Sequence, residues 1–217
     1  FHFNWFREIE IYLVNNTSFG NLGVDIEAQL FGEDMPEQEG VSSGVMNLPK
    51  ISRAPLNFAE LGGTWLNSEP LTAEDLQGKV VLVDFWTYSC INCIRTLRYI
   101  QGYWDKYKDS PFILIGVHTP EFVFEKDTGN VQEAIDRHGL TYPVVQDNDF
   151  QIWSSYSNRY WPAKYLVDAS GYIRYTHFGE GAYDETDEAI AALLKEIGVE
   201  VAEGAEGTEG TEGRVRR

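Results

Sequence analysis

The chain has 217 residues, with 34 acidic side chains against 17 basic ones and a formal net charge of -17 at pH 7. This length allows one domain with appendages, or at most two small domains. Hydrophobic residues at 43% and aromatic residues at 14% are enough for a packed core, which excludes a wholly disordered chain. The charge argues against binding to nucleic acid or to an anionic membrane surface, because both require clustered Lys and Arg. Two cysteines exclude a disulfide-dense scaffold.

Residues 1–55 are predicted to form an N-terminal extension that ends in a linker. Two alternating runs, 9–14 and 24–30, flank a turn-rich stretch and predict a β-hairpin. Residues 32–55 are punctuated by Gly, Pro and acids, which is typical of a linker. The chain has no apolar run of about 18 residues, so we expect no membrane span in it. It begins at Phe1 without a basic-then-apolar leader, and we expect a processed or truncated product whose missing upstream part holds a signal or an anchor.

Residues 56–200 are predicted to form one α/β domain with a mixed sheet. A near-continuous apolar run is typical of a strand that is buried on both faces. Apolar residues at spacings of three and four predict amphipathic helices, and glycine is a natural residue after a helix end. The predicted elements are, in chain order, a strand at 79–86, a helix from Cys90 to about 107, a strand at 112–117, a helix at 130–138 before Gly139, a hairpin of 163–168 with 172–177, and a helix with Ile190, Leu193, Leu194 and Ile197 on one face that stops at Gly198.

Residues 201–217 are predicted to be a disordered tail. A repeat of Glu, Gly and Ala or Thr supplies no large apolar side chain up to residue 213. Such a segment cannot bury enough surface to offset the loss of chain entropy. The predicted organisation is therefore an extension, one domain and a tail.

Cys90 and Cys93 lie where the first predicted strand gives way to a helix. Functional groups in open α/β sheets gather at the carboxyl ends of parallel strands. At a helix N-terminus, free N–H groups and the macrodipole lower the pKa of a thiol and supply the thiolate that attacks disulfides. Cys93, one turn later, is within reach to resolve a mixed disulfide. Arg95 and Arg98 add positive charge beside the pair, which acts in the same direction.

Asp84 is the second informative residue, because it stands inside an otherwise apolar strand. A buried carboxylate is costly unless it is neutral or has a partner. Desolvation raises the pKa of such a group, which makes Asp84 a candidate proton shuttle. The alternative is that Asp84 faces a polar edge of the sheet and takes no part in chemistry.

These residues carry a resemblance to a known family. Asp84, followed six residues later by Cys90-Ile91-Asn92-Cys93, is similar to the motif of the thioredoxin superfamily. Longer strings resemble its TlpA/DipZ-type extracytoplasmic branch, and they are WTYSCINCIRTL (86–97), GVHTPEF (116–122), FEKD (124–127), YPVVQDND (142–149), WPAKYLVDASG (161–171) and HFGEGAY (177–183). The similarity spans about residues 61–198. It implies a thioredoxin-like fold, in which helices flank a central mixed β-sheet.

The resemblance also implies roles for individual residues. Cys90 would be the attacking thiolate, Cys93 the buried resolving thiol, Asp84 the acid that assists proton transfer to and from Cys93, and Pro162 a cis-proline that faces the dithiol. The residues expected to line the site or bind substrate are Trp86, Ser89, Ile91, Asn92, Trp161, His118 and Glu121. Simpler interpretations stay open: a core role for Trp86, an ordinary strand-start proline at Pro162, and loop stabilisation by His118 and Glu121. Two positions depart from the family, with Arg98 where a proline is frequent and Ile91-Asn92 in place of Gly-Pro.

The function that the resemblance implies is thiol–disulfide oxidoreduction, in which a CxxC dithiol reduces or exchanges protein disulfides. We expect no metal and no cofactor other than the redox-active Cys90–Cys93 disulfide. The implied partners are disulfide-containing proteins and an upstream thiol electron donor such as a membrane reductase. The implied location is extracytoplasmic, in a periplasm or cell envelope. The sequence leaves open the substrate and the direction of electron flow.

Two other functions compete. A thiol peroxidase is indicated by Thr87-x-x-Cys90, although Val83 stands where the peroxiredoxin pattern has a proline. A metal-binding chaperone would use the cysteines with His118 or His177 as ligands. Covalent c-type haem is excluded, because Ile94 occupies the position where CxxCH needs histidine.

Overall fold

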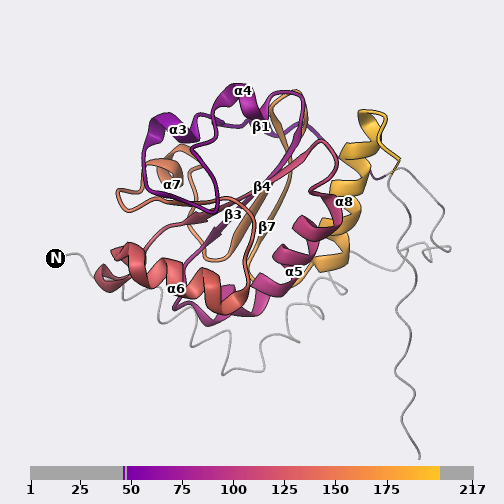
Figure 1. Cartoon of the computed structure of the whole chain (residues 1–217). Helices are drawn as coiled ribbons and strands as arrows, with labels where there is room; N and C mark the ends of the chain where they lie inside the picture. The colour runs from indigo at the N-terminus through magenta and orange to yellow at the C-terminus, as the bar shows by residue number, and fades with distance from the viewer. Residues whose placement is uncertain (1–45, 47, 201–217) are drawn as a thin grey trace, which may run out of the picture. The chain divides into compact units, whose positions relative to one another are not determined.

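A mixed seven-stranded sheet forms the centre of the computed structural model, which describes residue 46 and residues 48–200 (Figure 1). The strand order is β1-β7-β6-β3-β4-β5-β2. The neighbours β3, β4 and β5 run parallel, whereas the remaining pairs are antiparallel. The strands are β1 (Ser52–Arg53), β2 (Trp65–Leu66), β3 (Val80–Trp86), β4 (Phe112–His118), β5 (Val144–Gln146), β6 (Ala163–Val167) and β7 (Tyr172–Phe178). The predicted α/β class with a mixed sheet is confirmed.

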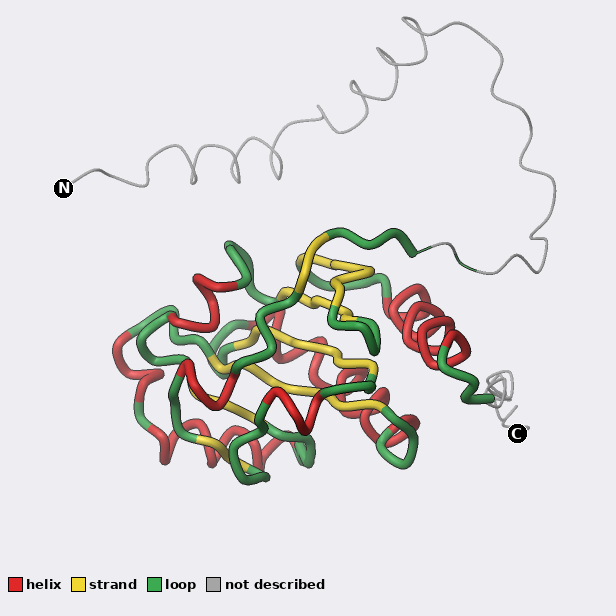
Figure 2. Tube along the Cα trace, turned by 90° about the horizontal axis from the view of Figure 1, so that it is seen from above, coloured by secondary structure: helices red, strands yellow, loops and turns green. Residues whose placement is uncertain are grey.

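Helices cover both faces of this sheet (Figure 2). They are α3 (Phe58–Leu61), α4 (Ala73–Leu76), α5 (Ile91–Tyr107), α6 (Thr128–His138), α7 (Gln151–Ser155) and α8 (Tyr183–Glu196), with a short 3-10 helix η2 (Val123–Lys126). Side chains alternate along β3, so Leu82 and Trp86 pack with α5, α6 and α8, while Val83 and Phe85 pack with α3, α4 and α7. All seven residues of β3 are buried, which explains its continuous apolar run.

The long predicted elements are confirmed with small shifts at their ends. The strands at 79–86 and 112–117, the helix after Cys90, the helix at 130–138 and the hairpin correspond to β3, β4, α5, α6 and the β6–β7 pair. Gly139 ends α6 in the left-handed conformation, with a φ of 62°. One position is wrong: α8 ends at Glu196, and the side chain of Ile197 is 38% exposed instead of lying on the buried face.

Several short elements had no signal in the sequence. Strand β5 has three residues, which is too few for a period to emerge, although it is buried and pairs with β4. Strand β1 lies within the predicted extension 1–55 and pairs with β7. The boundaries of the extension, domain and tail stay predictions. The predicted hairpin at 9–14 and 24–30 and the tail at 201–217 lie outside the described residues.

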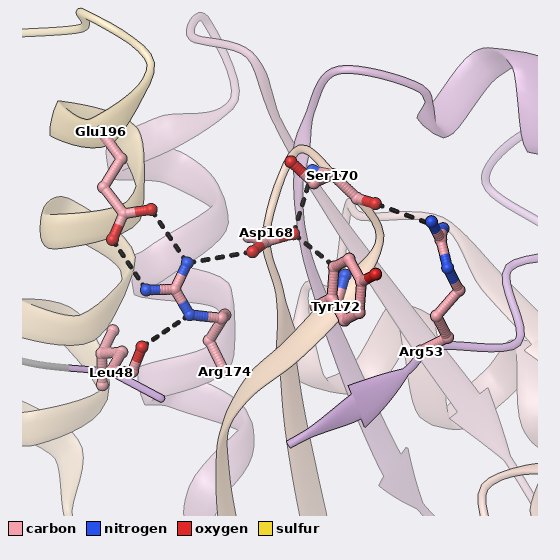
Figure 3. A network of polar contacts seen from close by, with 7 residues as sticks. All are labelled: Leu48, Arg53, Asp168, Ser170, Tyr172, Arg174 and Glu196. Carbon is pink, nitrogen blue, oxygen red and sulfur yellow. Dashed lines mark hydrogen bonds and ion pairs between the residues drawn. The ribbon is translucent and has the colours of Figure 1, made fainter. Parts of the chain in front are cut away.

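Arg174 on β7 joins three segments of the chain through a partly buried polar network (Figure 3). Its guanidinium pairs with Asp168 and with Glu196 at the end of α8, each at 2.9 Å, and its Nε donates to the Leu48 carbonyl at 2.7 Å. The side chains of Arg174 and Asp168 are only 11% and 7% exposed. Asp168 also accepts the backbone N–H groups of Ser170 and Tyr172 in the β6–β7 turn. The network thus fastens the chain around Leu48 to the sheet and to the last helix.

Removing the Arg174 charge should destabilise the domain strongly. Arg174→Met leaves Asp168 buried without its cation, and breaking such a pair costs about 3 kcal/mol of unfolding free energy. The control is Arg137→Met, whose ion pair with Glu133 joins side chains that are 61% and 69% exposed. An exposed pair of that kind contributes at most about 1 kcal/mol. Urea denaturation of both variants measures the difference, and equal losses would contradict the structural role of the network.

Candidate active site

Cys90 occupies the N-cap of helix α5, directly after the turn that ends β3. Its backbone is extended, with φ -72° and ψ 113°, and its N–H donates to the Thr87 carbonyl at 3.3 Å. Its Sγ accepts the backbone N–H of Cys93 at 3.4 Å. The sulfur therefore takes the place of the oxygen that usually caps a helix, and it faces the first-turn N–H groups. The predicted start of the helix at Cys90 is confirmed.

Hydrogen bonds lower the pKa of the Cys90 thiol to about 7. The largest cause is the hydrogen bond with the Cys93 side chain, and the backbone N–H groups of Cys93 and Asn92 act in the same direction. Partial burial and the Glu121 carboxylate oppose this shift. The sequence predicted that Arg95 and Arg98 would also lower the pKa of Cys90. In the structure, neither arginine is among the main groups that shift this pKa. Arg95 instead pairs with Glu180 at 3.2 Å.

Cys93 is completely buried one turn into α5, and its surroundings are opposite to those of Cys90. Desolvation is the main reason why the pKa of the Cys93 thiol lies well above its usual range, and its hydrogen bond to Cys90 adds to this. Both cysteines are free thiols in this structure. The site therefore pairs a half-buried sulfur that ionises near neutral pH with a protonated sulfur that needs a base to react.

Asp84 lies beneath the dithiol in the middle of β3, with an exposure of 0%. Desolvation raises the pKa of its carboxyl group to about 7, and the charge of Lys164 opposes the rise. The Asp84 charge in turn helps to raise the pKa of Cys93. The alternative in which Asp84 faces a polar edge of the sheet is wrong, since the residue is enclosed.

Pro162 precedes β6 at the end of the sheet where the dithiol lies. The Trp161–Pro162 peptide bond is cis, and Ala163, the next residue, pairs with Phe85 near the carboxyl end of β3. The indole N–H of Trp161 donates to the Thr119 carbonyl at 3.0 Å, which joins this loop to the loop after β4. Both residues are thus held beside the dithiol end of β3.

His118 and Trp86 support the dithiol loop from inside the protein. Burial lowers the pKa of His118 to about 4, so its imidazole is neutral at pH 7. Its Nε2 lies 3.4 Å from the backbone nitrogen of Tyr88, whose N–H points toward it. Its ring stacks on the Tyr88 ring with the ring centroids 5.6 Å apart. Trp86 is 0% exposed and packs edge-on against His118, at 5.1 Å. Trp86 is therefore a core residue behind the site and does not line its surface.

Glu125 is a site residue that the sequence analysis missed. Its buried carboxylate accepts Ser89 Oγ at 2.5 Å and the backbone N–H groups of Glu121 and Phe122 at 2.6 and 2.8 Å. Burial alone would raise the pKa of Glu125, but the hydrogen bonds from Ser89, Thr87 and these N–H groups outweigh it and lower the pKa. The carboxylate therefore ties the loop after β4 to the residue before Cys90. The one signal of Glu125 in the sequence is its place in the FEKD string at 124–127, which the family resemblance includes but which does not indicate burial.

Exposed apolar side chains flank the half-buried thiol. Ile91, between the cysteines, is 57% exposed, and Phe122 and Phe124 on the loop held by Glu125 are 50% and 56% exposed. The two phenylalanine rings stack at 5.5 Å, and the Phe124 carbonyl accepts the Tyr88 hydroxyl at 3.0 Å. Ser89 and Asn92 are exposed at the same turn. Within the described residues, no group of three or more His, Cys, Asp or Glu is arranged to hold a metal ion.

Comparisons of the sequence with known proteins identify relatives of this chain. The AhpC/TSA family model matches residues 56–176. The chain is 42% identical over 179 residues to the protein DipZ of Mycobacterium tuberculosis, a match that covers 81% of this chain and 25% of DipZ. It is 31% identical over 133 residues to the thiol-disulfide oxidoreductase YkuV of Bacillus subtilis, covering 61% of this chain and 88% of YkuV. The chain thus spans about a quarter of the length of DipZ.

Solved structures agree with these sequence matches. The solution structure of a thioredoxin-like protein in its oxidized form superposes with a TM-score of 0.59 at 31% identity, covering 66% of this chain and 97% of that one. The crystal structure of a thiol-disulfide isomerase from Corynebacterium glutamicum superposes with a TM-score of 0.57 at 26% identity, covering 68% and 97%. The expected thioredoxin-like fold is therefore confirmed.

The lowered pKa of Cys90 predicts how its reactivity depends on pH. In the reduced protein, alkylation of Cys90 by iodoacetamide should rise with pH around a midpoint of about 7, because only the thiolate reacts. Cys93 should not react in the folded protein, since it is buried and protonated. Mass spectrometry of quenched samples locates the adduct. A midpoint near 9, the ordinary value for a thiol, would show that the helix cap does not stabilise the thiolate.

Burial of Asp84 predicts a pH-dependent loss of stability. The pKa of Asp84 is about 7 in the folded chain against 3.8 for a free carboxyl, so the folded state binds more protons between these values. Stability should therefore fall as pH rises through this window, by about 4 kcal/mol in total. Asp84→Asn removes this dependence, whereas Asn at the exposed Asp149 should preserve it. Urea denaturation at several pH values tests this, and equal slopes for the wild type and Asp84→Asn would contradict the assignment.

Proposed function

This chain belongs to the AhpC/TSA family and to the thioredoxin-like thiol–disulfide oxidoreductases, and we propose that it reduces or exchanges disulfides of protein substrates outside the cytoplasm. The observation that carries the proposal is the contrast between two sulfurs one helical turn apart. Cys90 ionises near neutral pH at the N-cap of α5, while Cys93 is buried and protonated. A nucleophile at the surface with a resolving thiol behind it is the arrangement that disulfide exchange needs.

The chemistry proceeds in two exchanges. The Cys90 thiolate attacks one sulfur of the substrate disulfide, so that a mixed disulfide forms and the other substrate sulfur leaves as a thiolate. Cys93 then gives its proton to Asp84 and attacks the Cys90 sulfur. The Cys90–Cys93 disulfide forms and the remaining substrate sulfur leaves. No cofactor beyond this disulfide takes part, and an upstream thiol donor returns the pair to the reduced state.

The surface around Cys90 supports a polypeptide substrate. Ile91, Phe122 and Phe124 expose apolar area at the dithiol end of the sheet, where the cis Trp161–Pro162 segment also lies. Apolar side chains exposed together are suited to contacts with the chain that flanks a disulfide.

The extracytoplasmic location rests on the resemblance of the motifs to the TlpA/DipZ-type branch. Among the described residues, none of the helices combines the length and the apolar character that a membrane crossing requires. An anchor in a region upstream of the chain stays a prediction, as does the identity of the electron donor.

Variants of the two cysteines test the proposed reaction. The reduced wild type should accelerate the reduction of insulin by dithiothreitol. Cys90→Ser should lower this activity by at least about a hundredfold, because Cys93 is buried and protonated. Cys93→Ser should retain the first step and accumulate a mixed disulfide that gel electrophoresis without reductant detects.

The controls separate this activity from its competitors. Serine at both cysteines should give neither activity nor adduct. If Cys93→Ser trapped no adduct and the wild type reduced no insulin, the proposed function would be wrong. Rapid consumption of hydrogen peroxide by Cys90 would instead favour the thiol peroxidase.

A further inference from the structure

Lys164 is a buried lysine in the middle of β6, where lysine is rarely found. Its side chain is 0% exposed, and its Nζ has no hydrogen-bond partner among the residues that the structure describes. The antiparallel register of β3 and β6 places Lys164 directly opposite Asp84. Side chains that are directly opposite on antiparallel strands project from the same face, about 5 Å apart at Cβ. The Lys164 side chain therefore projects from the same face of the sheet as the buried Asp84 carboxylate, and its charge acts on that carboxylate without a hydrogen bond between the two groups.

Further polar atoms without partners gather around this pair. Both Asp84 carboxylate oxygens, Trp86 Nε1 and Tyr142 Oη are buried and have no hydrogen bond within the described part of the chain. Gly116 lies opposite Asp84 on β4, and its lack of a side chain lets the rings of Tyr142 and Trp86 approach the backbone there. A Cβ at this position would lie 2.8 Å from Tyr142 Cε2 and 3.1 Å from Trp86 Nε1. Buried polar groups without partners cost stability, so several of them beside a dithiol indicate a function.

The titratable and apolar groups around Asp84 come from several neighbouring helices and strands. Cys93 projects from α5, and Tyr142 precedes β5; the Asp84 charge raises the pKa of each of them. On the far side of β6, Lys164 pairs in register with His177 of β7. Helix α8, which also packs on this face, contributes apolar residues such as Ile190. Lys164 is the group whose positive charge favours the ionised form of Asp84.

We propose that Lys164 is a positioning residue for the second exchange, whose ammonium favours the ionised form of the Asp84 carboxylate, the form that takes the proton of Cys93. This inference rests on the proposed function and extends it to a residue that touches neither sulfur nor substrate. In the second exchange, the proton leaves Cys93 Sγ for an Asp84 oxygen, and the Cys93–Cys90 bond forms as the Cys90–substrate bond breaks. The electron pair of that bond leaves with the substrate sulfur.

The aromatic disulfide dithiobis(nitrobenzoate) resolves the two exchanges in one experiment. Attack by Cys90 releases one coloured nitrothiolate, and attack by Cys93 on the resulting mixed disulfide releases the second. Stopped-flow absorbance of the full chain between about pH 6 and about pH 10 then gives a rate and a pH midpoint for each step. The variants are Lys164→Met, Lys164→Arg and Asp84→Asn, with Lys164→Met also made in the Asp84→Asn background.

Loss of the Lys164 charge should act on the second release alone. In Lys164→Met its midpoint should move up by about one to two pH units, which slows it at pH 7 by about tenfold or more. The first release should keep its rate and its midpoint near 7, which also shows that the variant is folded. Lys164→Arg keeps the charge and should keep the wild-type midpoint. In the Asp84→Asn background, Lys164→Met should have no further effect.

The outcomes separate this inference from the function on which it rests. Lys108→Met removes the same charge from an ion pair with Asp105 in which Lys108 is 42% exposed, and it should change neither release. The inference is overturned if Lys164→Met leaves the second midpoint in place, slows the second release equally at every pH, or slows it as much in the Asp84→Asn background. A wild type that releases only one nitrothiolate would instead overturn the proposed function.

Discussion

The site depends on a sulfur standing where a helix cap normally has an oxygen. Strand β3 delivers the chain to the first turn of α5, and there the backbone N–H of Cys93 points at Cys90 Sγ. Free N–H groups at a helix start require an acceptor, and a thiolate is a better acceptor than a thiol. The fold therefore stabilises the charged form of this sulfur through the same contact that begins the helix. Any change that moved the helix start by one residue would remove both effects.

The same turn gives its two cysteines opposite environments. Cys90 lies at the rim with apolar residues such as Ile91 and Phe122 exposed around it, whereas Cys93 faces the core between α5 and the sheet. Low dielectric surroundings keep the inner sulfur protonated, so it waits for a base. Asp84 is enclosed in the same apolar layer, and its pKa of about 7 fits the transfer of a proton at neutral pH. Burial that is costly for stability is thus the source of the reactivity.

Residues far apart in the sequence hold this turn in place. Glu125 binds Ser89 and the N–H groups of the loop after β4, and His118 supports Tyr88 from the end of β4. The cis Trp161–Pro162 segment is joined to that loop through the Thr119 carbonyl. These contacts join three loops at one end of the sheet, and together they hold the turn that carries the half-buried thiol.

The sequence was sufficient to predict the elements with a clear period and the residues that contradict their surroundings. The apolar run of β3, the spacing in α5 and a carboxylate inside a strand predicted the strand-turn-helix and the buried Asp84, and the family motif supplied the cis-proline. Glu125 lies in the FEKD string of the family resemblance, but its burial comes from contact with Ser89 before the dithiol, and no local pattern distinguishes it from a solvated glutamate. Lys164 did carry a signal, a lysine inside an apolar strand, but the register that places it opposite Asp84 is a tertiary property. For the same reason the effect of Arg95 was misjudged, since its partner Glu180 is distant in sequence.

The network around Arg174 determines at which end of the sheet the chain enters the domain. Leu48 is held beside β7 near the β6–β7 turn, and the register of β6 with β3 places that turn at the amino end of β3, opposite the dithiol. The chain therefore enters the sheet at one pole while the reactive sulfur lies at the other. A tether that pulls on the entry pole leaves the reactive pole free to meet a partner, because the entering chain is held to the sheet there by the Leu48–Arg174 hydrogen bond and by the pairing of β1 with β7.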